Sequence, residues 1–325
     1  MKKIISFLCL ALLPLTFIGC QKKQGNADKY VNLHGYVFDN LYRARYSTLR
    51  SNIPLYFFNE NKNIPYMSIN DLIDKFGDVY LSGIDSIQNK LRVNQQDAIY
   101  TITNPISNQT LKLDMETGQY IYSLKDEFFV TDSYLTNDPF NVVPDDPSVT
   151  SMFKITNHQY NKGASDVTGN LNDYNIAPIY QKGVGYLPLK IGLDLIRNSL
   201  DNNVIYNGTD LFQLSPALLS LISITDLENE MLGTWNINTS DADFLRFALN
   251  EMCFLLDQEH GMKDKFNITN YHQFIVDCGL ENEFLSSPRS FNIALCKLFG
   301  EYLADGGHTA VVDMYKDAKN IHPED

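Results

Sequence analysis

Residues 66–76 read YMSINDLIDKF, and residues 186–196 read YLPLKIGLDLI. The two stretches lie 120 positions apart, share a tyrosine and an aspartate, and match at most apolar positions. Each pattern is typical of a short strand that runs into an amphipathic helix, and a further apolar strand follows each copy, at 79–81 and 204–206. The sequence therefore predicts two related strand-helix-strand units. Ancient duplication is the preferred explanation, and chance similarity of two amphipathic helices is the alternative.

The chain around the first copy has the composition of β structure. Residues 55–58 and 99–102 are aromatic and β-branched, and residues 111–122 form two apolar runs separated by the turn sequence DMETG. Residues 137–150 are rich in proline, aspartate and asparagine and predict a linker. After the second copy, Asn207-Gly208 predicts a tight turn into another strand.

Beyond residue 235 the apolar period becomes helical. We expect helices capped by Ser240 and Thr269, and a third opened by the N-cap and N1 pair Ser287-Pro288. Three short amphipathic helices can bury one common core. The predicted fold class is α+β, with two related strand-helix-strand modules followed by a small helical bundle.

The pattern divides the chain into six parts. They are a leader at 1–19, a polar tether at 20–29, a first α+β module at 30–147, a second at 148–235, a helical segment at 236–312 and a tail at 313–325.

The leader has the features of an export signal. Basic residues at 2–3 precede an apolar run at 4–18, which is too short for a membrane-spanning helix. The run ends in Phe-Ile-Gly-Cys at 17–20 and resembles the lipobox of bacterial lipoproteins. That resemblance implies lipidation of Cys20, a membrane partner held through this lipid, and a place in the cell envelope on the exported face. The alternative is an ordinary signal peptide in which Cys20 is incidental.

Three cysteines remain once Cys9 leaves with the leader and Cys20 carries lipid. They are Cys253, Cys278 and Cys296. Each lies in an apolar, helix-like run, so we expect small buried hydrophobic side chains, with at most one disulfide among them. A zinc site formed by Cys253, His260, His272 and Cys278 is a minor alternative, because its spacings fit no closed-site pattern.

Charge and motifs exclude several functions. The chain has 26 basic and 39 acidic residues, a net charge of −13, and no basic cluster longer than two residues, so no nucleic-acid partner is expected. It has no Gly-x-Ser-x-Gly, His-Glu-x-x-His or Gly-x-x-x-x-Gly-Lys motif. The carboxylates at 145–146, 281 and 283 are expected to be solvated, and His260 and His272 to lie at the surface or to have their hydrogen bonds satisfied within the fold. We assign no catalytic residue, no metal site and no cofactor.

The segment GEYLADGGHT at 300–309 resembles the Leu-x-Asp-Asp-Gly-His-Thr segment of tail-specific, or C-terminal-processing, serine proteases. Residues 255–264, LLDQEHGMKD, are similar to the stretch that begins the helical part in lipoprotein members of that family, and Asn207-Gly208 matches their Tyr-Asn-Gly hairpin. The family landmarks are Asp305, Gly307, His308 and Thr309. Gly306 and His260 depart from the family pattern.

The resemblance implies a Ser nucleophile with a Lys base in a β-rich core that follows the His-Thr segment. Only 16 residues follow Thr309, and they include Lys316 and Lys319 but no serine. We therefore expect the N-terminal, non-catalytic part of such a peptidase, inactive alone and without the catalytic core. The alternative is a surface or periplasmic binding lipoprotein. Either protein could take a protein or peptide partner.

Overall fold

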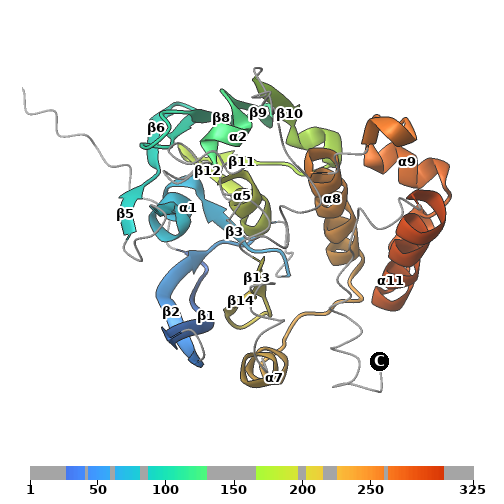
Figure 1. Ribbon diagram of the computed structural model, residues 1–325, viewed down its shortest axis with the longest axis horizontal. Helices are drawn as coiled ribbons and strands as arrows, with labels where there is room; N and C mark the ends of the chain where they lie inside the picture. Colours follow the sequence, from blue (N-terminus) through green and yellow to red (C-terminus); the bar gives the residue numbers. More distant parts are fainter. Residues whose placement is uncertain are drawn as a thin grey trace, which may run out of the picture.

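The computed structural model describes residues 27–40, 43–58, 63–80, 87–129, 166–196, 203–214, 225–259 and 263–303. Helices and sheets are both abundant, which confirms the α+β class. Figure 1 shows the sheets and two central helices on one side and a group of helices, in orange and red, on the other.

The two copies of the repeat lie against each other at the centre of the molecule. The first copy forms β3 (Tyr66–Ser68) and α1 (Ile69–Phe76), and the second forms β12 (Val184–Pro188) and α5 (Leu189–Ile196). Both helices have eight residues and begin at equivalent positions. The predicted units are therefore present, and their apolar helix faces are buried.

The pairing of the two copies is symmetric. Strands β3 and β12 are antiparallel, with Met67 opposite Leu187 and with Tyr66 and Ser68 opposite Pro188 and Tyr186. Because Met67 and Leu187 are equivalent positions of the repeat, this register has a local two-fold axis at that pair. Strand β11 (Ile179–Gln181) extends the sheet on the β12 side, and a bridge from Tyr56 to Tyr66 extends it on the other. The symmetry supports duplication over chance similarity.

Local hydrogen bonds explain where the two helices begin. The Ser68 side chain accepts from the Asp71 N–H at 3.1 Å and donates to the Asp71 carboxylate at 2.6 Å, which caps α1. In α5 a proline occupies the equivalent position, and the first helical N–H, of Leu189, donates to the Pro65 carbonyl at 2.8 Å. One orphan donor of each helix is thus satisfied, and in the second copy the acceptor belongs to the first.

A five-stranded antiparallel sheet packs above these helices in Figure 1, in the order β10-β9-β8-β7-β6. Its strands are β6 (Arg92–Gln96), β7 (Ile99–Thr103), β8 (Thr110–Asp114), β9 (Gln119–Tyr122) and β10 (Val167–Asn170). The predicted turn joins β8 to β9: Asp114 accepts from the N–H groups of Glu116 and Thr117, and Gly118 has φ of 74°.

A four-stranded sheet occupies the opposite end, in the order β13-β14-β1-β2. It consists of β1 (Lys29–Asn40), β2 (Arg43–Leu55), β13 (Asn203–Tyr206) and β14 (Leu211–Leu214), with β1 and β14 parallel and the other pairs antiparallel. A two-stranded ribbon joins β4 (Asp78–Tyr80) to β5 (Ile87–Lys90). Each repeat helix is thus followed by a hairpin, β4–β5 or β13–β14.

The helical part begins with α7 (Thr225–Gly233) and the long α8 (Ala242–Glu259). It continues through η3 (Lys263–Phe266), α9 (Tyr271–Asp277), α10 (Glu281–Phe284), α11 (Pro288–Lys297) and the π-helical turn η4 (Leu298–Leu303). Short turns α2 (Lys125–Phe128) and η1 (Leu171–Tyr174) complete the described elements.

The helix caps were only partly predicted. Ser287 caps α11 as expected, since its hydroxyl accepts from the Ser290 N–H at 3.1 Å. The prediction that Ser240 caps α8 is wrong, because Asp241 accepts from the N–H groups of Asp243 and Phe244. Thr269 is likewise not the cap of α9: Asn270 accepts from the Gln273 N–H at 3.0 Å. In both cases the cap is one residue later, where the amide oxygen or carboxylate reaches the first turn.

One large core cluster extends from Val31 on β1 to Leu303 at the end of η4, and α7 packs through a smaller separate cluster in which Met231 meets Phe212. Sheets formed by β9 with β10, by β3 with β12 and by β1 with β14 join strands from the stretches 30–147 and 148–235. The two stretches therefore interlace and do not form separate sheets. The linker expected at 137–150 lies outside the described residues.

Candidate functional site

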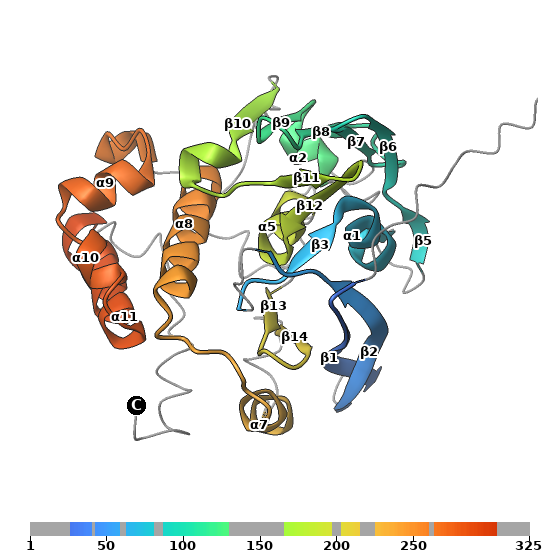
Figure 2. The ribbon, with the colours of Figure 1, turned by 180° about the vertical axis from the view of Figure 1, so that it is seen from behind.

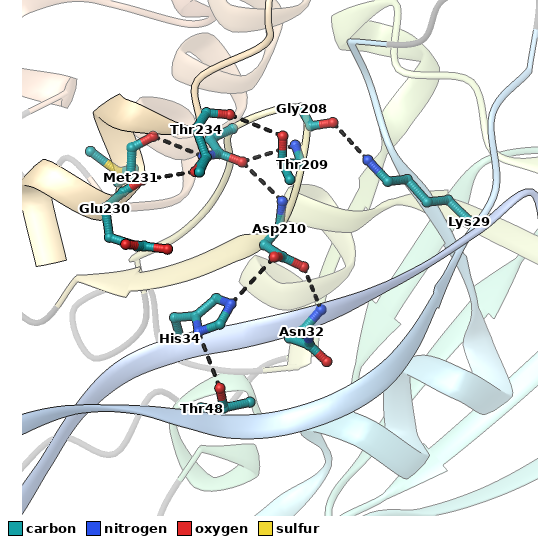
Figure 3. Close-up of polar contacts among 11 residues, drawn as sticks. Lys29, Asn32, His34, Thr48, Gly208, Thr209, Asp210, Glu230, Met231 and Thr234 are labelled. Carbon is teal, nitrogen blue, oxygen red and sulfur yellow. Dashed lines mark hydrogen bonds and ion pairs between the residues drawn. The ribbon is translucent and has the colours of Figure 1, made fainter.

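The most extensive described chain of polar side chains lies where β1 meets β2 and the β13–β14 hairpin (Figure 3). His34 on β1 is at its centre, opposite Thr48 on β2 and Phe212 on β14 in the strand registers. Irregular registers on both sides of Leu33 shift β2 and place Thr48 opposite His34. We call this group, with Asn32 and Asp210, the His34 chain.

The His34 chain connects a hydroxyl, an imidazole and a carboxylate. The Thr48 hydroxyl lies 3.3 Å from His34 Nδ1, and His34 Nε2 lies 3.4 Å from an Asp210 carboxylate oxygen. The other oxygen of Asp210 accepts from the Asn32 N–H at 2.7 Å. The imidazole is fixed further by Phe212, whose ring centroid is 5.3 Å away. Figure 3 shows Asp210 between His34 and Asn32.

The turn that carries Asp210 is anchored by a fully buried amide. The Asn207 side chain donates to the Met231 carbonyl and to the Thr234 hydroxyl, each at 2.8 Å. Its oxygen accepts from the N–H groups of Thr209 and Asp210, each at 2.9 Å. This amide therefore shapes the hairpin and fastens it to the end of α7 at the same time.

Gly208 and Lys29 complete the junction. Gly208 has φ of 91°, and a Cβ there would lie 2.5 Å from the Asn236 carbonyl oxygen, so the predicted turn needs glycine. The Lys29 ammonium donates to the Gly208 carbonyl at 2.7 Å and to the Tyr206 hydroxyl at 3.3 Å. Burial, with a smaller contribution from Asp210, raises the pKa of Tyr206 to about 12, so its hydroxyl stays protonated.

The order hydroxyl, imidazole, carboxylate is the order that activates nucleophiles in hydrolases. With the proton on Nε2, the imidazole would donate to Asp210 and accept from Thr48. In this structure Asp210 also binds the β1 backbone at Asn32, and His34 lies on β1 between β2 and β14. The main consequence of the geometry is that the hairpin is fastened to β1. Thr48 is the exposed end of the chain.

A second polar cluster joins the end of α8 to the rest of the molecule. Asp257, 3% exposed, forms a 2.6 Å ion pair with Lys263 and accepts from the Tyr271 N–H at 3.2 Å. Burial, followed by the charge of Asp257, raises the pKa values of the Tyr174 and Tyr120 hydroxyls. The cluster lies in the 255–264 stretch on which the family resemblance depends, and its role is to hold α8, η3 and α9 together.

The structure does not place the family landmarks. Cys20, Asp305, Gly307, His308 and Thr309 lie outside the described residues, as does His260. The described chain ends at Leu303, at the end of η4 and two residues before Asp305, the first of these landmarks.

The cysteines differ from the prediction. Cys253 is fully buried, as expected, but Cys278 is partly exposed and Cys296 is exposed on α11, and all three are free thiols. The prediction of burial for all three is therefore wrong: Cys278 ends α9 and packs only partly against the core, and Cys296 occupies an exposed position of α11. No three metal-ligating side chains gather within the part of the chain that the structure describes.

The sequence predicts the Asn207-Gly208 turn but gives no signal for the His34 chain. In the sequence Asp210 is only the residue after a turn, and no motif marks His34. His34 and Asp210 come together because β1 pairs in parallel with β14, and no local sequence pattern predicts that pairing.

Comparisons with known proteins found nothing: no family model, no curated protein and no solved structure matches the chain. Among the described helices, none combines the length and apolar character required to cross a membrane.

Proposed function

We propose that this protein is a lipid-anchored lipoprotein of a bacterial cell envelope, and that its folded part is a non-catalytic module for a protein or peptide partner. In this proposal it corresponds to the N-terminal part of a tail-specific serine peptidase and has no peptidase activity by itself. The anchor is the lipid on Cys20, and the module stands on the exported face of the membrane.

The non-catalytic assignment rests on the contacts of the His34 chain, which connect the β13–β14 hairpin to β1. Asp210 divides its two carboxylate oxygens between His34 and the Asn32 N–H, so the carboxylate that meets the imidazole also ties the β13–β14 hairpin to β1. The Asp257 carboxylate likewise connects separate elements, because it binds Lys263 on η3 and the Tyr271 N–H on α9. Polar groups in the described residues thus join distant elements.

The resemblance to the peptidase family agrees with the helical character of the C-terminal part. Residues 255–259 complete α8, and helices continue to Leu303, which lies within the 300–309 segment. In the family the catalytic core follows that segment. The proposal therefore assigns the described residues to the portion that precedes catalysis.

The first experiment tests the anchor. The chain with Cys20→Ala is expressed in a bacterium beside wild type and a Cys9→Ala control, which changes only the leader. We expect Cys20→Ala to move into the soluble fraction and to lose the mass of the lipid, while Cys9→Ala stays in the membrane. A Cys20→Ala protein that remains in the membrane would exclude this anchor.

The second experiment tests the absence of catalysis. The purified chain from residue 20 is incubated with casein, with unstructured peptides and with a serine-reactive probe. We expect neither hydrolysis nor labelling. Hydrolysis that disappears in Thr48→Val would instead assign a hydrolase to the His34 chain, and stoichiometric serine labelling would contradict the proposal directly.

The alternative is a binding lipoprotein that makes no use of a peptidase ancestry. The kind of partner that the protein binds distinguishes this alternative from the first proposal. The soluble form, immobilised on beads, is exposed to envelope extract with and without excess unstructured peptide. Retention of one partner that peptide does not displace favours the alternative, whereas capture of extended peptides favours a peptidase-like module.

A further inference from the structure

Helices α5 and α8 meet at a cluster of three charged side chains. Lys190 and Asp194 lie one turn apart on α5, with the ammonium 2.8 Å from the carboxylate. Glu251 on α8 lies 3.7 Å from the same ammonium. The side chains are 22%, 3% and 20% exposed, so the cluster is largely shielded from water.

The cluster has more negative than positive groups. With all three ionised, two carboxylates share one ammonium and a net negative charge is enclosed between the helices. Removing charge from water is costly, and two carboxylates near each other favour binding a proton. The geometry therefore creates a position where one proton stabilises the helix contact.

Glu251 is the group that takes this proton. Burial, with a further contribution from Asp194 and against the opposing effect of Lys190, raises the pKa of the Glu251 carboxyl to about 7. Lys190 stays charged, since Glu251 and Asp194 raise its pKa more than burial lowers it. The ammonium is thus the fixed charge of the cluster.

The surroundings of Glu251 contain no other charge that acts on it within the described residues. The charged groups on elements in contact with α8 are Lys125 on α2, Asp173 on η1, Lys263 and Lys265 on η3, His272 and Asp277 on α9, and Glu281 and Glu283 on α10. None of them contributes to the protonation of Glu251, which depends on burial and on the two α5 residues.

We propose that the Lys190–Asp194–Glu251 cluster is a proton-controlled latch between α5 and α8. With Glu251 protonated, the cluster is neutral overall and the helices hold together. Loss of the proton to solvent leaves two carboxylates on one ammonium and weakens the contact. Figures 1 and 2 show α8 beside α5 and between it and α9–α11, so the latch controls how firmly the helical part is held. This inference does not depend on the lipid anchor.

The direction of the pH effect follows from linkage. The carboxyl of Glu251 has a pKa of 4.5 in its ordinary state and about 7 in the folded protein. The folded state therefore binds this proton more tightly, and the stabilisation present at low pH is lost as the pH rises through 7. Between pH 6 and pH 8 these two pKa values predict that the equilibrium constant between the docked and the undocked state of α8 falls about tenfold.

The experiment is hydrogen exchange of the full chain at pH 6 and pH 8, corrected for the intrinsic exchange rate and followed in peptides from α8. We expect wild type to lose about tenfold in protection at pH 8. Glu251→Gln, which resembles the protonated side chain, should keep its protection at both values. Glu116→Gln, at an exposed turn position, should behave like wild type.

Two results would overturn the latch. One is a Glu251→Gln variant whose α8 protection has the same pH dependence as wild type. The other is a direct ¹³C titration of the Glu251 carboxyl in the folded protein with a midpoint near 4.5. If Glu251→Gln is poorly folded, the carboxyl titration of wild type decides alone.

Discussion

Leu72 and Gly192, equivalent positions of the internal repeat, contact each other where α1 and α5 cross. A Cβ at Gly192 would lie 2.8 Å from one methyl carbon of Leu72 and 3.4 Å from the other. Leu72 is 1% exposed, so its side chain fills the space that Gly192 leaves open. A symmetric pair of helices cannot place a leucine from both copies at the same point. The two copies have therefore diverged into a large and a small residue.

Replacing Gly192 with alanine should destabilise the protein. In an open helix the change would add stability, because alanine is the better helix former. Here the methyl group forces Leu72 to move within a packed core, at a cost of about 1–3 kcal/mol. Urea unfolding followed by circular dichroism measures the change. Gly300→Ala is the matched control, since nothing lies within 4 Å of a Cβ there.

The same pair should show coupling in a double-mutant cycle. Leu72→Ala alone leaves a cavity and costs about 2–5 kcal/mol. In the Leu72→Ala background, Gly192→Ala partly fills that cavity and should be neutral or stabilising. Additive effects of the two changes would mean that the residues do not share this space.

Asp210→Ala should loosen the β13–β14 hairpin from β1. The change leaves the partly buried Asn32 N–H and the His34 imidazole without the carboxylate, and an unsatisfied donor of this kind costs at most about 1–3 kcal/mol. Asp210→Asn should reduce stability less than Asp210→Ala does, because its amide oxygen can still accept from the Asn32 N–H. Unfolding midpoints and exchange of the β14 amides measure the effect. Asp243→Ala, at an exposed position of α8, should change little, and an equal effect there would contradict a specific role for Asp210.

Lys263→Met should destabilise the junction of α8 with α9 much more than Lys297→Met affects α11. Lys263 neutralises Asp257, which is 3% exposed, and an uncompensated buried charge costs about 3–5 kcal/mol. Lys297 pairs at 2.7 Å with Glu283, which is 39% exposed, and water can replace it. Thermal unfolding of the two variants compares them directly. Similar shifts in the two melting temperatures would refute the distinction.

The three thiols of the folded part should react in a fixed order. Cys296 is exposed and should be alkylated first, followed by the partly exposed Cys278. Cys253 should react only after unfolding, because it is inaccessible and because burial, with a smaller effect of Asp257, raises its pKa to about 12. Mass spectrometry of peptides after timed iodoacetamide treatment shows the order. Labelling of Cys253 in the native protein as fast as Cys296 would place it elsewhere than in the core.

The features predicted from sequence are those stabilised within a few residues. The turn between β8 and β9 forms because Asp114 and Gly118 are four residues apart and satisfy local backbone groups. The Ser287 cap was found for the same reason. The Asp241 cap was missed by one residue because serine and aspartate cap equally well, and the choice between neighbours depends on where the first helical turn packs.

The candidate site was only half visible in the sequence. Asn207-Gly208 predicts its turn, since glycine is needed where φ is positive. His34, Thr48 and Asp210 gave no signal, because they come from strands whose pairing is not local. The latch was hidden for the same reason: Lys190 and Asp194 look like an ordinary surface pair until α8 brings Glu251 to them.

By itself the sequence determined the repeated strand and helix units, the turn at Asn207-Gly208 and the amphipathic helices after residue 235, because hydrophobic period, caps and turns act over short distances. Tertiary structure decided that β3 pairs with β12 about a two-fold axis, that β14 joins β1, and that α8 lies on α5. These contacts depend on which buried surfaces fit each other between segments that lie far apart in the chain, and periodicity does not encode that choice. The pairing of Leu72 with Gly192 is the clearest case: the repeat makes them equivalent, and only packing makes them complementary.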